Sequence, residues 1–245
     1  MDTLVEIKNL HKKFDTKIAV DDISFTVSRG AVLGFLGPNG AGKSTTMKMI
    51  TGFLAPDAGT VVIAGHDLEK DPVQVKRHIG YLPEGAPLYS EMTPATFLEF
   101  IGEMRGFRGE ELNKRIRETV GKINLQQVLE QPIATLSKGF KRRVGIAQAI
   151  LHDPDVLVLD EPTDGLDPNQ KFEVRNLIRN MAKEKAIVLS THILEEVDAV
   201  CTRAMIIAAG KLVADGTPAE LAARASSGRL DDLFREVTQA VQAVS

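Results

Sequence analysis

Two kinds of hydrophobic pattern divide the chain. Residues 3–8 and 17–28 alternate polar and apolar positions, which is typical of exposed antiparallel strands. The runs at 31–36, 156–159 and 186–189 are apolar at nearly every position, which indicates strands buried on both faces of a parallel sheet. A polar loop and a helical pattern follow each run, so the pattern predicts an α/β core.

Residues 94–152 carry a different pattern, with apolar positions spaced three and four apart. One helical stripe consists of Phe97, Phe100, Ile101 and Met104, and another of Leu112, Ile116, Val120 and Ile123. This stretch predicts a helical subdomain inserted between two strands of the sheet. Residues 203–215 indicate a closing pair of strands around Gly210, and the rest of the chain predicts helices interrupted at 225–228.

These patterns predict a single domain over residues 1–245. Its core, which includes an antiparallel β subdomain, is expected at about 1–90 and 154–215, its helical subdomain at about 91–153 and a helical tail at about 216–245. The tail has an apolar stripe at helical spacing, formed by Leu230, Leu233, Phe234, Val237 and Val241. This stripe predicts either packing on the chain's own domain or a contact that helps dimerisation.

Composition narrows the classes of function. The 245 residues include 30 basic and 33 acidic side chains, and the net charge of −3 argues against a primarily electrostatic nucleic-acid binder. The single cysteine, Cys201, excludes an internal disulfide framework and fits a reducing compartment. The chain has no apolar run near the ~20 residues of a transmembrane helix and no signal pattern, so any membrane role is expected to need a partner.

A phosphate-binding loop is the strongest chemical motif. Residues 37–44 fit G-x-x-x-x-G-K-[ST] between an apolar strand and a helical run. The motif comprises Gly37, Pro38, Asn39, Gly40, Ala41, Gly42, Lys43 and Ser44, and Thr45 opens the helix. Glycines let backbone N–H groups surround phosphate oxygens, while the lysine would neutralise the β- and γ-phosphates and the serine hydroxyl would coordinate Mg²⁺.

Two carboxylates end the apolar run at 156–159. Asp160 and Glu161 are predicted at the carboxyl edge of the sheet, where open α/β folds bind ligands. Asp160 would hold Mg²⁺ directly or through water, and Glu161 could accept a proton from an attacking water. Without the phosphate loop, the pair could equally be an ordinary turn after a strand.

Three further segments complete the pattern: LSKGF at 136–140, PTDGLD at 162–167 and STH at 190–192. With the phosphate loop before them, the chain resembles the nucleotide-binding subunit of ABC transporters over about residues 3–215. The resemblance implies a P-loop NTPase core with a RecA-like, mostly parallel sheet. Other P-loop NTPases lack the motif at 136–140, and a GTPase would need an N-K-x-D sequence that is absent here.

The resemblance also implies roles for individual residues on the nucleotide. Phe14 matches the aromatic that stacks on adenine, although it could instead be a packed strand residue. His192 matches the histidine that contacts the γ-phosphate. Glu84 stands where the family usually has a glutamine that senses Mg²⁺, the attacking water and the membrane partner. A carboxylate there adds negative charge and could bind Mg²⁺ more strongly.

Further residues are implied to serve a second subunit. Ser137 and Gly139 keep the hydroxyl and the backbone donor that meet the γ-phosphate of ATP bound in the partner, whereas Lys138 and Phe140 replace a glycine and a glutamine of the usual LSGGQ. Ser137 could otherwise be a simple helix cap. Asp167 matches the aspartate of the loop that crosses the dimer interface. Asp164 stands where serine is more common.

The remaining polar residues carry weaker signals. Residues 141–143 are expected to form a solvated basic helix face, with phosphate steering as the alternative. Cys201 is expected to be a buried small hydrophobe. The other histidines match nothing and are expected at the surface or in turns; they are His11, His66, His78 and His152.

The expected function is ATP hydrolysis, with Mg²⁺, that powers transport through a separate integral-membrane permease. The resemblance implies a head-to-tail dimer around ATP, either a homodimer or a heterodimer, which is expected to lie peripherally on the cytoplasmic face of the membrane. The short tail, Glu84 and the LSKGF variant resemble bacterial exporters linked to gliding motility and drug export. One alternative is a permease-free ATPase in assembly, for example of iron–sulfur clusters. Another is an ATP sensor without turnover, which intact Lys43, Glu161 and His192 argue against.

Overall fold

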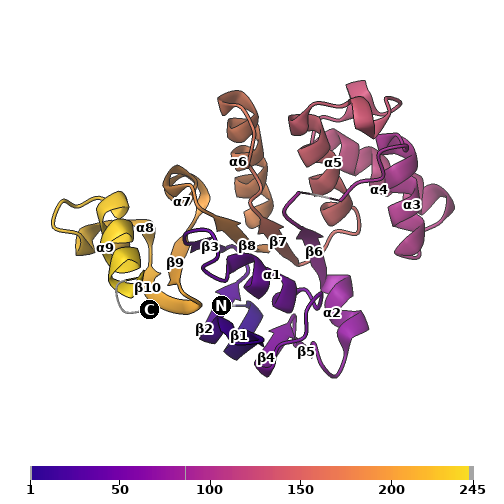
Figure 1. Ribbon diagram of the computed structural model, residues 1–245. Coiled ribbons are helices and arrows are strands. Elements are labelled where there is room, and N and C mark those ends of the chain that lie inside the picture. Colours follow the sequence, from indigo (N-terminus) through magenta and orange to yellow (C-terminus); the bar gives the residue numbers. More distant parts are fainter. Residues whose placement is uncertain (1, 86, 243–245) are drawn as a thin grey trace.

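The computed structural model describes residues 2–85 and 87–242 (Figure 1). The first of its two sheets is antiparallel. In this sheet the order is β2 (Lys17–Ser28), β1 (Thr3–Phe14), β4 (Ala58–Ile63) and β5 (His66–Asp67). Along β2 the buried residues Val20, Ile23, Phe25 and Val27 are separated by more exposed ones, so one face of the sheet meets the core. The alternation at 17–28 therefore predicted the strand correctly.

The second sheet is mostly parallel and has six strands in the order β10-β9-β3-β8-β7-β6. All neighbours are parallel except β10 and β9. Its strands are β3 (Val32–Leu36), β6 (Ile79–Leu82), β7 (Val156–Asp160), β8 (Ala186–Thr191), β9 (Arg203–Ala208) and β10 (Lys211–Gly216). Every residue of β3, β7 and β8 is buried, as the continuous apolar runs predicted, which confirms the α/β core.

Helix α1 (Lys43–Ile50) lies between the two sheets (Figure 1). Its buried Met47, Met49 and Ile50 share one apolar cluster with residues of both sheets. This packing fixes the helix whose first turn follows the phosphate loop.

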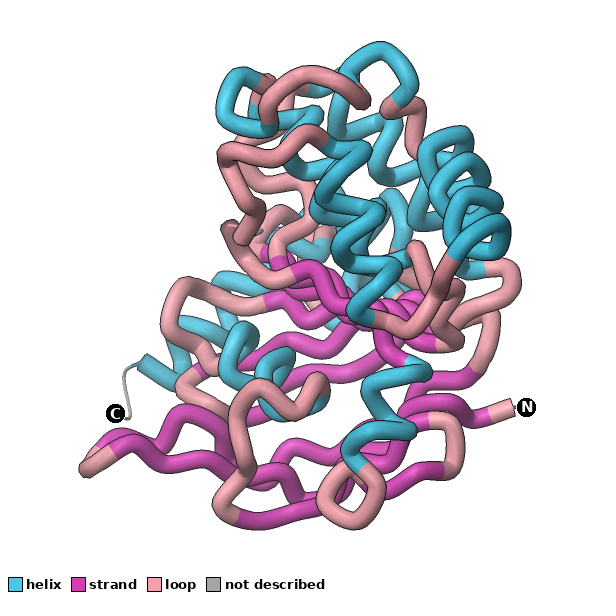
Figure 2. Tube along the Cα trace, turned by 90° about the vertical axis from the view of Figure 1, so that its right-hand side faces the viewer, coloured by secondary structure: helices cyan, strands magenta, loops and turns pink. Residues whose placement is uncertain are grey.

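A group of helices connects β6 to β7 and stands apart from the antiparallel sheet (Figures 1 and 2). It contains α3 (Pro94–Met104), α4 (Gly109–Lys122), the 3₁₀ turns Gln126–Val128 and Ile133–Thr135, and α5 (Lys138–Ile150). Buried Phe97, Val120 and Val144 share an apolar cluster with residues of β7. The predicted helices are present, although Met104 is 73% exposed and does not contribute to the core. The remaining helix before β6 is α2 (Pro72–His78).

The tail packs on its own domain. After α6 (Pro168–Ala182) and α7 (Leu194–Val200), the chain ends in α8 (Pro218–Arg224) and α9 (Leu230–Gln242). Leu230 and Leu233 are buried in a cluster with Leu36, Val197 and other residues beside β9, and Phe234 and Val237 pack against it. The first alternative for the tail stripe is therefore observed; the side chain of Val241 lies outside the described part of the chain. No helix within residues 2–85 and 87–242 is long and apolar enough to span a bilayer.

Candidate functional site

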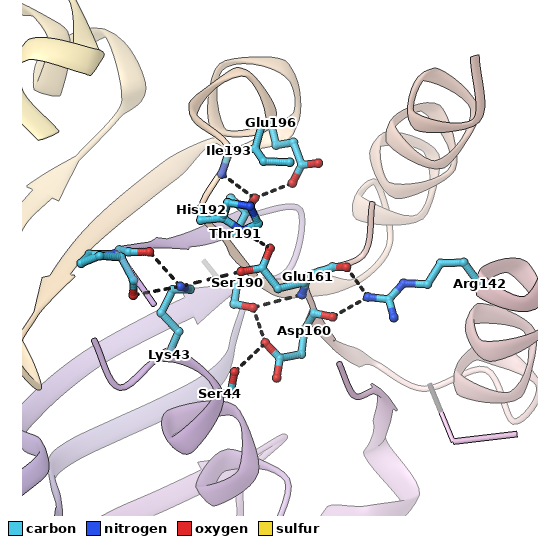
Figure 3. Close-up of polar contacts among 12 residues, drawn as sticks. Lys43, Ser44, Arg142, Asp160, Glu161, Ser190, Thr191, His192, Ile193 and Glu196 are labelled. Carbon is cyan, nitrogen blue, oxygen red and sulfur yellow. Dashed lines mark hydrogen bonds and ion pairs between the residues drawn. The ribbon is translucent and has the colours of Figure 1, made fainter. Parts of the chain in front are cut away.

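Three neighbouring parallel strands, β3, β8 and β7, bring the predicted motifs to one edge of the sheet. Leu36 lies opposite Thr191, and Asp160 lies opposite Ser190, so the three strands end at nearly the same level. The phosphate loop follows β3, Glu161 follows β7 and His192 follows β8. This carboxyl edge is where open α/β sheets bind ligands, and Figure 3 shows the side chains converging there.

The phosphate loop is packed too closely for side chains at two of its glycines. A Cβ on Gly42, whose φ is 107°, would lie 2.3 Å from the Ala19 carbonyl oxygen. A Cβ on Gly37 would lie 2.4 Å from the Ile207 carbonyl oxygen. Only glycine fits both places. Because these positions carry no Cβ, the backbone N–H groups of the loop can point toward an anion at the start of α1.

Lys43 places a buried cation inside this loop. Its side chain is 6% exposed, and Nζ donates to the carbonyl oxygens of Gly37 (2.8 Å) and Pro38 (3.3 Å). The same ammonium lies 3.7 Å from Glu161 Oε1. A cation held there can neutralise the terminal phosphates of a nucleotide in the loop.

Asp160 and Ser44 offer oxygens suited to Mg²⁺. Ser44 Oγ donates to Asp160 Oδ1 at 3.2 Å, and Ser190 Oγ donates to the same oxygen. The other carboxylate oxygen, Asp160 Oδ2, is buried and has no hydrogen-bond partner within residues 2–85 and 87–242. Mg²⁺ usually binds one or two protein oxygens together with water and substrate phosphates. A free buried carboxylate oxygen beside a serine hydroxyl fits that preference.

Glu161 faces both Lys43 and His192. Its backbone has a φ of 49°, in the left-handed region that a residue with a side chain rarely adopts. The N–H donates to the carbonyl (3.2 Å) and the hydroxyl (3.1 Å) of Ser190. Its Oε2 lies 2.9 Å from Nδ1 of His192, while Oε1 faces Lys43. The carboxylate is thus held in a position from which it can accept a proton from water.

A cleft of about 410 Å³ joins Lys43, Ser44 and Glu161 to Phe14 and Glu84. Phe14 is 46% exposed, so its ring is open to a ligand. The cleft, which we call the loop cleft, is lined by Phe14, Lys17, Ala19, Asn39, Gly40, Gly42, Lys43, Ser44, Thr45, Glu84 and Glu161. Its volume is within the range of small-molecule sites, roughly 300–1,000 Å³.

The three residues predicted to serve a partner subunit do not line the loop cleft. Ser137 caps α5 and accepts from the N–H of Phe140 at 3.3 Å, and Asp167 caps α6 and accepts from the N–H of Gln170 at 3.0 Å. Gly139 packs on the same Gln170, where an added Cβ would lie 2.4 Å from its side chain. Ser137 is therefore a helix cap, and nothing in this arrangement directs it toward its own chain's phosphate loop.

Two contributing residues were missed by the sequence analysis. Ser190 was assigned no role, although it ends a buried strand beside the acidic one and contacts both Asp160 and Glu161. Arg142 was assigned to a solvated face, and this was wrong: it is 7% exposed and donates to backbone carbonyls. The buried stripe of α5 contains Gly139, Arg142, Ile146 and Ala149, so helical spacing carried the signal for its burial.

The neighbours of Arg142 lie closer to the surface. Lys141 Nζ donates to the Ala134 carbonyl at 2.9 Å, and Arg143 forms an ion pair with Glu173. Cys201 is partly buried between two apolar clusters, and burial raises its thiol pKa to about 12. A thiol of this kind packs as a small hydrophobe, as predicted.

Comparisons with known proteins identify the relatives of this chain. The profile of the family described as "ABC transporter" matches residues 20–164. The probable multidrug ABC transporter ATP-binding protein YbhF of Escherichia coli (strain K12) is 37% identical over 232 residues, which are 94% of this chain and 40% of YbhF. The chain thus spans less than half the length of that relative.

Two further matches extend over most of this chain and most of the matched chain. The daunorubicin resistance ATP-binding protein DrrA3 of Streptomyces coeruleorubidus is 34% identical over 245 residues, which are 100% of this chain and 78% of DrrA3. A solved structure described as the "ATP binding subunit of ABC transporter" matches with a TM-score of 0.86 and 32% identity, over 96% of this chain and 99% of that chain. By these matches the chain belongs to the ABC transporter family.

Proposed function

We propose that this chain is an ATP-hydrolysing subunit that powers export of a substrate through a separate integral-membrane permease. The observation that carries the proposal is the meeting of Lys43, Asp160, Glu161 and His192 at one sheet edge. The direction of transport is inferred from relatives whose names refer to multidrug transport and daunorubicin resistance.

Within one chain, the loop cleft supplies the ATP site. The phosphate loop and Lys43 hold the β- and γ-phosphates, and Phe14 stacks on adenine. Ser44 and Asp160 hold Mg²⁺, with Glu84 as a further carboxylate that faces the same cleft. Glu161 accepts the proton of the attacking water, and His192 fixes the carboxylate while facing the γ-phosphate.

The second half of each ATP site comes from another subunit in this proposal. Ser137, Gly139 and Asp167 lie outside their own loop cleft, which supports their use by a partner in a head-to-tail dimer. Residues 91–153 would act as the helical subdomain that carries Ser137 and Gly139 to that partner. The permease would hold the dimer at the cytoplasmic face of the membrane. The net charge of −3 gives no electrostatic reason for nucleic-acid binding.

Lys43→Ala tests the ATP site, with Lys48→Ala as the matched control. Lys48 lies in the same helix and is exposed. Phosphate release with Mg²⁺ and ATP affinity by calorimetry would be measured for wild type and both variants. We expect Lys43→Ala to lose about 100-fold or more in turnover, because the γ-phosphate loses its fixed cation, and Lys48→Ala to behave as wild type. Normal affinity and turnover in Lys43→Ala would refute the assignment of the loop.

A further inference from the structure

Arg142 is a buried cation that joins two loops of the site. Its Nε donates to the Pro162 carbonyl at 3.0 Å, and its Nη1 donates to the Pro83 carbonyl at 3.3 Å. Its Nη2 donates to the carbonyls of Asp160 and Glu161 (Figure 3). The planar guanidinium can hold several acceptors in a fixed arrangement, which the single ammonium of lysine cannot do.

These carbonyls belong to the backbone on which the proposed catalysis depends. Residues 160–162 carry the metal ligand and the proposed base, and Pro83 directly precedes Glu84. Glu161 is held at a φ of 49°, which is costly for a residue with a side chain and persists only where the surroundings enforce it. Carbonyl oxygens directed at one point also repel one another unless a donor lies between them. Arg142 supplies that donor.

The surrounding charges favour a permanent cation at this point. Burial lowers the pKa of the Arg142 guanidinium, whereas Asp160, Asp164, Glu161 and Glu84 raise it. The group stays charged because arginine starts from a very high pKa. A fixed positive charge therefore lies behind Asp160 and Glu161, on the far side from Lys43 (Figure 3).

Arg142 also links the proposed base, Glu161, to α5, where Ser137 and Gly139 are proposed to serve a partner subunit. It lies in α5, which begins directly after Ser137 and includes Gly139. A displacement of α5 would move the guanidinium and with it the carbonyls of Glu161 and Pro83. The hydrogen bonds of Arg142 thus connect the position of the N-terminal end of α5, which we call the Ser137 end, to the geometry of Glu161.

We propose that Arg142 is a positioning residue that sets the backbone of Glu161 and of Pro83–Glu84 for hydrolysis and couples both to the Ser137 end of α5. The inference rests on the proposed role of Glu161 as the base. It assigns Arg142 a much larger effect on turnover than on ATP affinity, because Arg142 contacts backbone carbonyls and does not itself line the loop cleft.

The test uses Arg142→Lys, which keeps the charge, and Arg142→Gln, which keeps one amide donor. Arg179→Lys is the matched control, because Arg179 also donates to a backbone carbonyl, that of Ala199 at 2.8 Å and 2.6 Å, and these bonds join α6 to α7. We expect both Arg142 variants to lose about 10- to 100-fold in kcat, the scale of a small misplacement of a catalytic group. Their dissociation constants for ATP should stay within a factor of about 2 of wild type, and the control should retain full kcat.

The double variant Arg142→Lys with Glu161→Gln separates positioning from other roles. If Arg142 acts through Glu161, single-turnover rates of the double variant will match those of Glu161→Gln alone. Rates that multiply instead, or wild-type kcat in both Arg142 variants, would overturn the inference. Loss of both ATP binding and the thermal unfolding transition in the two Arg142 variants would also overturn it, because Arg142 would then stabilise the fold as a whole. Wild-type hydrolysis by Glu161→Gln would instead refute the proposed base.

Discussion

Ser190 holds the carboxylate of Asp160 across two neighbouring strands. Its hydroxyl donates to Asp160 Oδ1 and accepts from the N–H of Glu161, and both contacts are buried. One side chain at the end of β8 thereby sets the rotamer of the residue that ends β7 and the backbone of the next residue. Among the described residues the other oxygen, Asp160 Oδ2, has no hydrogen-bond partner, so it is available to the proposed Mg²⁺.

Ser190→Ala should therefore weaken Mg²⁺ binding. Without the hydroxyl, the carboxylate of Asp160 loses its orientation, and changes to groups that orient a metal ligand typically cost about 10- to 100-fold in metal affinity. ATP hydrolysis measured against Mg²⁺ concentration should show a half-maximal concentration raised by about tenfold. Thr51→Ala is the control, because its buried hydroxyl donates only within the end of α1. An unchanged Mg²⁺ dependence of Ser190→Ala would contradict the proposed orientation.

Phe14→Ala should weaken ATP binding with little change in kcat. The ring is exposed in the loop cleft, and stacking of a base on an aromatic side chain is worth about 1–3 kcal/mol. The dissociation constant for ATP should rise by about tenfold or more. Phe53→Ala removes another exposed ring, one that does not line this cleft, and should bind ATP as wild type does. Equal affinities of Phe14→Ala and wild type would exclude Phe14 from the site.

The sequence predicted the groups of the site better than the contacts between them. Apolar runs located β3, β7 and β8, and the residues that follow such strands meet at one edge because neighbouring parallel strands end together. Neither spacing nor composition states which strands are neighbours. The order β3-β8-β7 is what brings Ser190 beside Asp160.

Arg142 was mispredicted for a related reason. Three basic residues in a row normally indicate a solvated surface, because burying a charge is costly. The cost is offset here by carbonyl acceptors from two segments that lie 18 or more positions away along the chain. Only the packing of α5 against those segments reveals them.

His152 should make the fold sensitive to acid. Its Nε2 donates to the Ile79 carbonyl at 3.0 Å, and its Nδ1 is buried with no partner in the part of the chain that the structure describes. Burial and the neighbouring Arg105 lower its pKa from 6.5 to about 4. Between these values the unfolded chain binds more protons at this histidine than the folded chain does. The free energy of unfolding therefore falls as the pH falls.

Urea unfolding at pH 7 and pH 5 measures this effect. His152 should remove about 1–2 kcal/mol of stability over that interval. His152→Gln keeps a donor for the Ile79 carbonyl and does not titrate, so it should lose less stability than wild type. If His152→Gln and wild type lose the same stability, the histidine is not the cause.

Ser137→Arg should block hydrolysis while leaving ATP binding by the monomer intact. Ser137 lies outside the loop cleft, and a long charged side chain there would obstruct only a partner's nucleotide. Turnover should fall to background, with the dissociation constant for ATP unchanged at low protein concentration. Thr93→Arg places the same side chain at the cap of α3 and serves as the control. Collapse of monomer binding in Ser137→Arg would mean that Ser137 serves its own site.

Glu161→Gln keeps the shape of the proposed base but removes its charge. Loss of a general base typically costs about 10²–10⁴ in rate, so bound ATP should persist. In the proposed dimer the γ-phosphate holds both subunits together, and a ligand that binds only the closed form shifts the equilibrium toward it.

The molar mass of Glu161→Gln, determined by size-exclusion chromatography with light scattering, tests this account most directly. The account predicts a species of about twice 26.7 kDa with ATP and Mg²⁺, and the monomer mass with ADP. A variant that has stopped hydrolysing ATP, retains bound ATP and still elutes at the monomer mass would contradict the ATP-bound dimer.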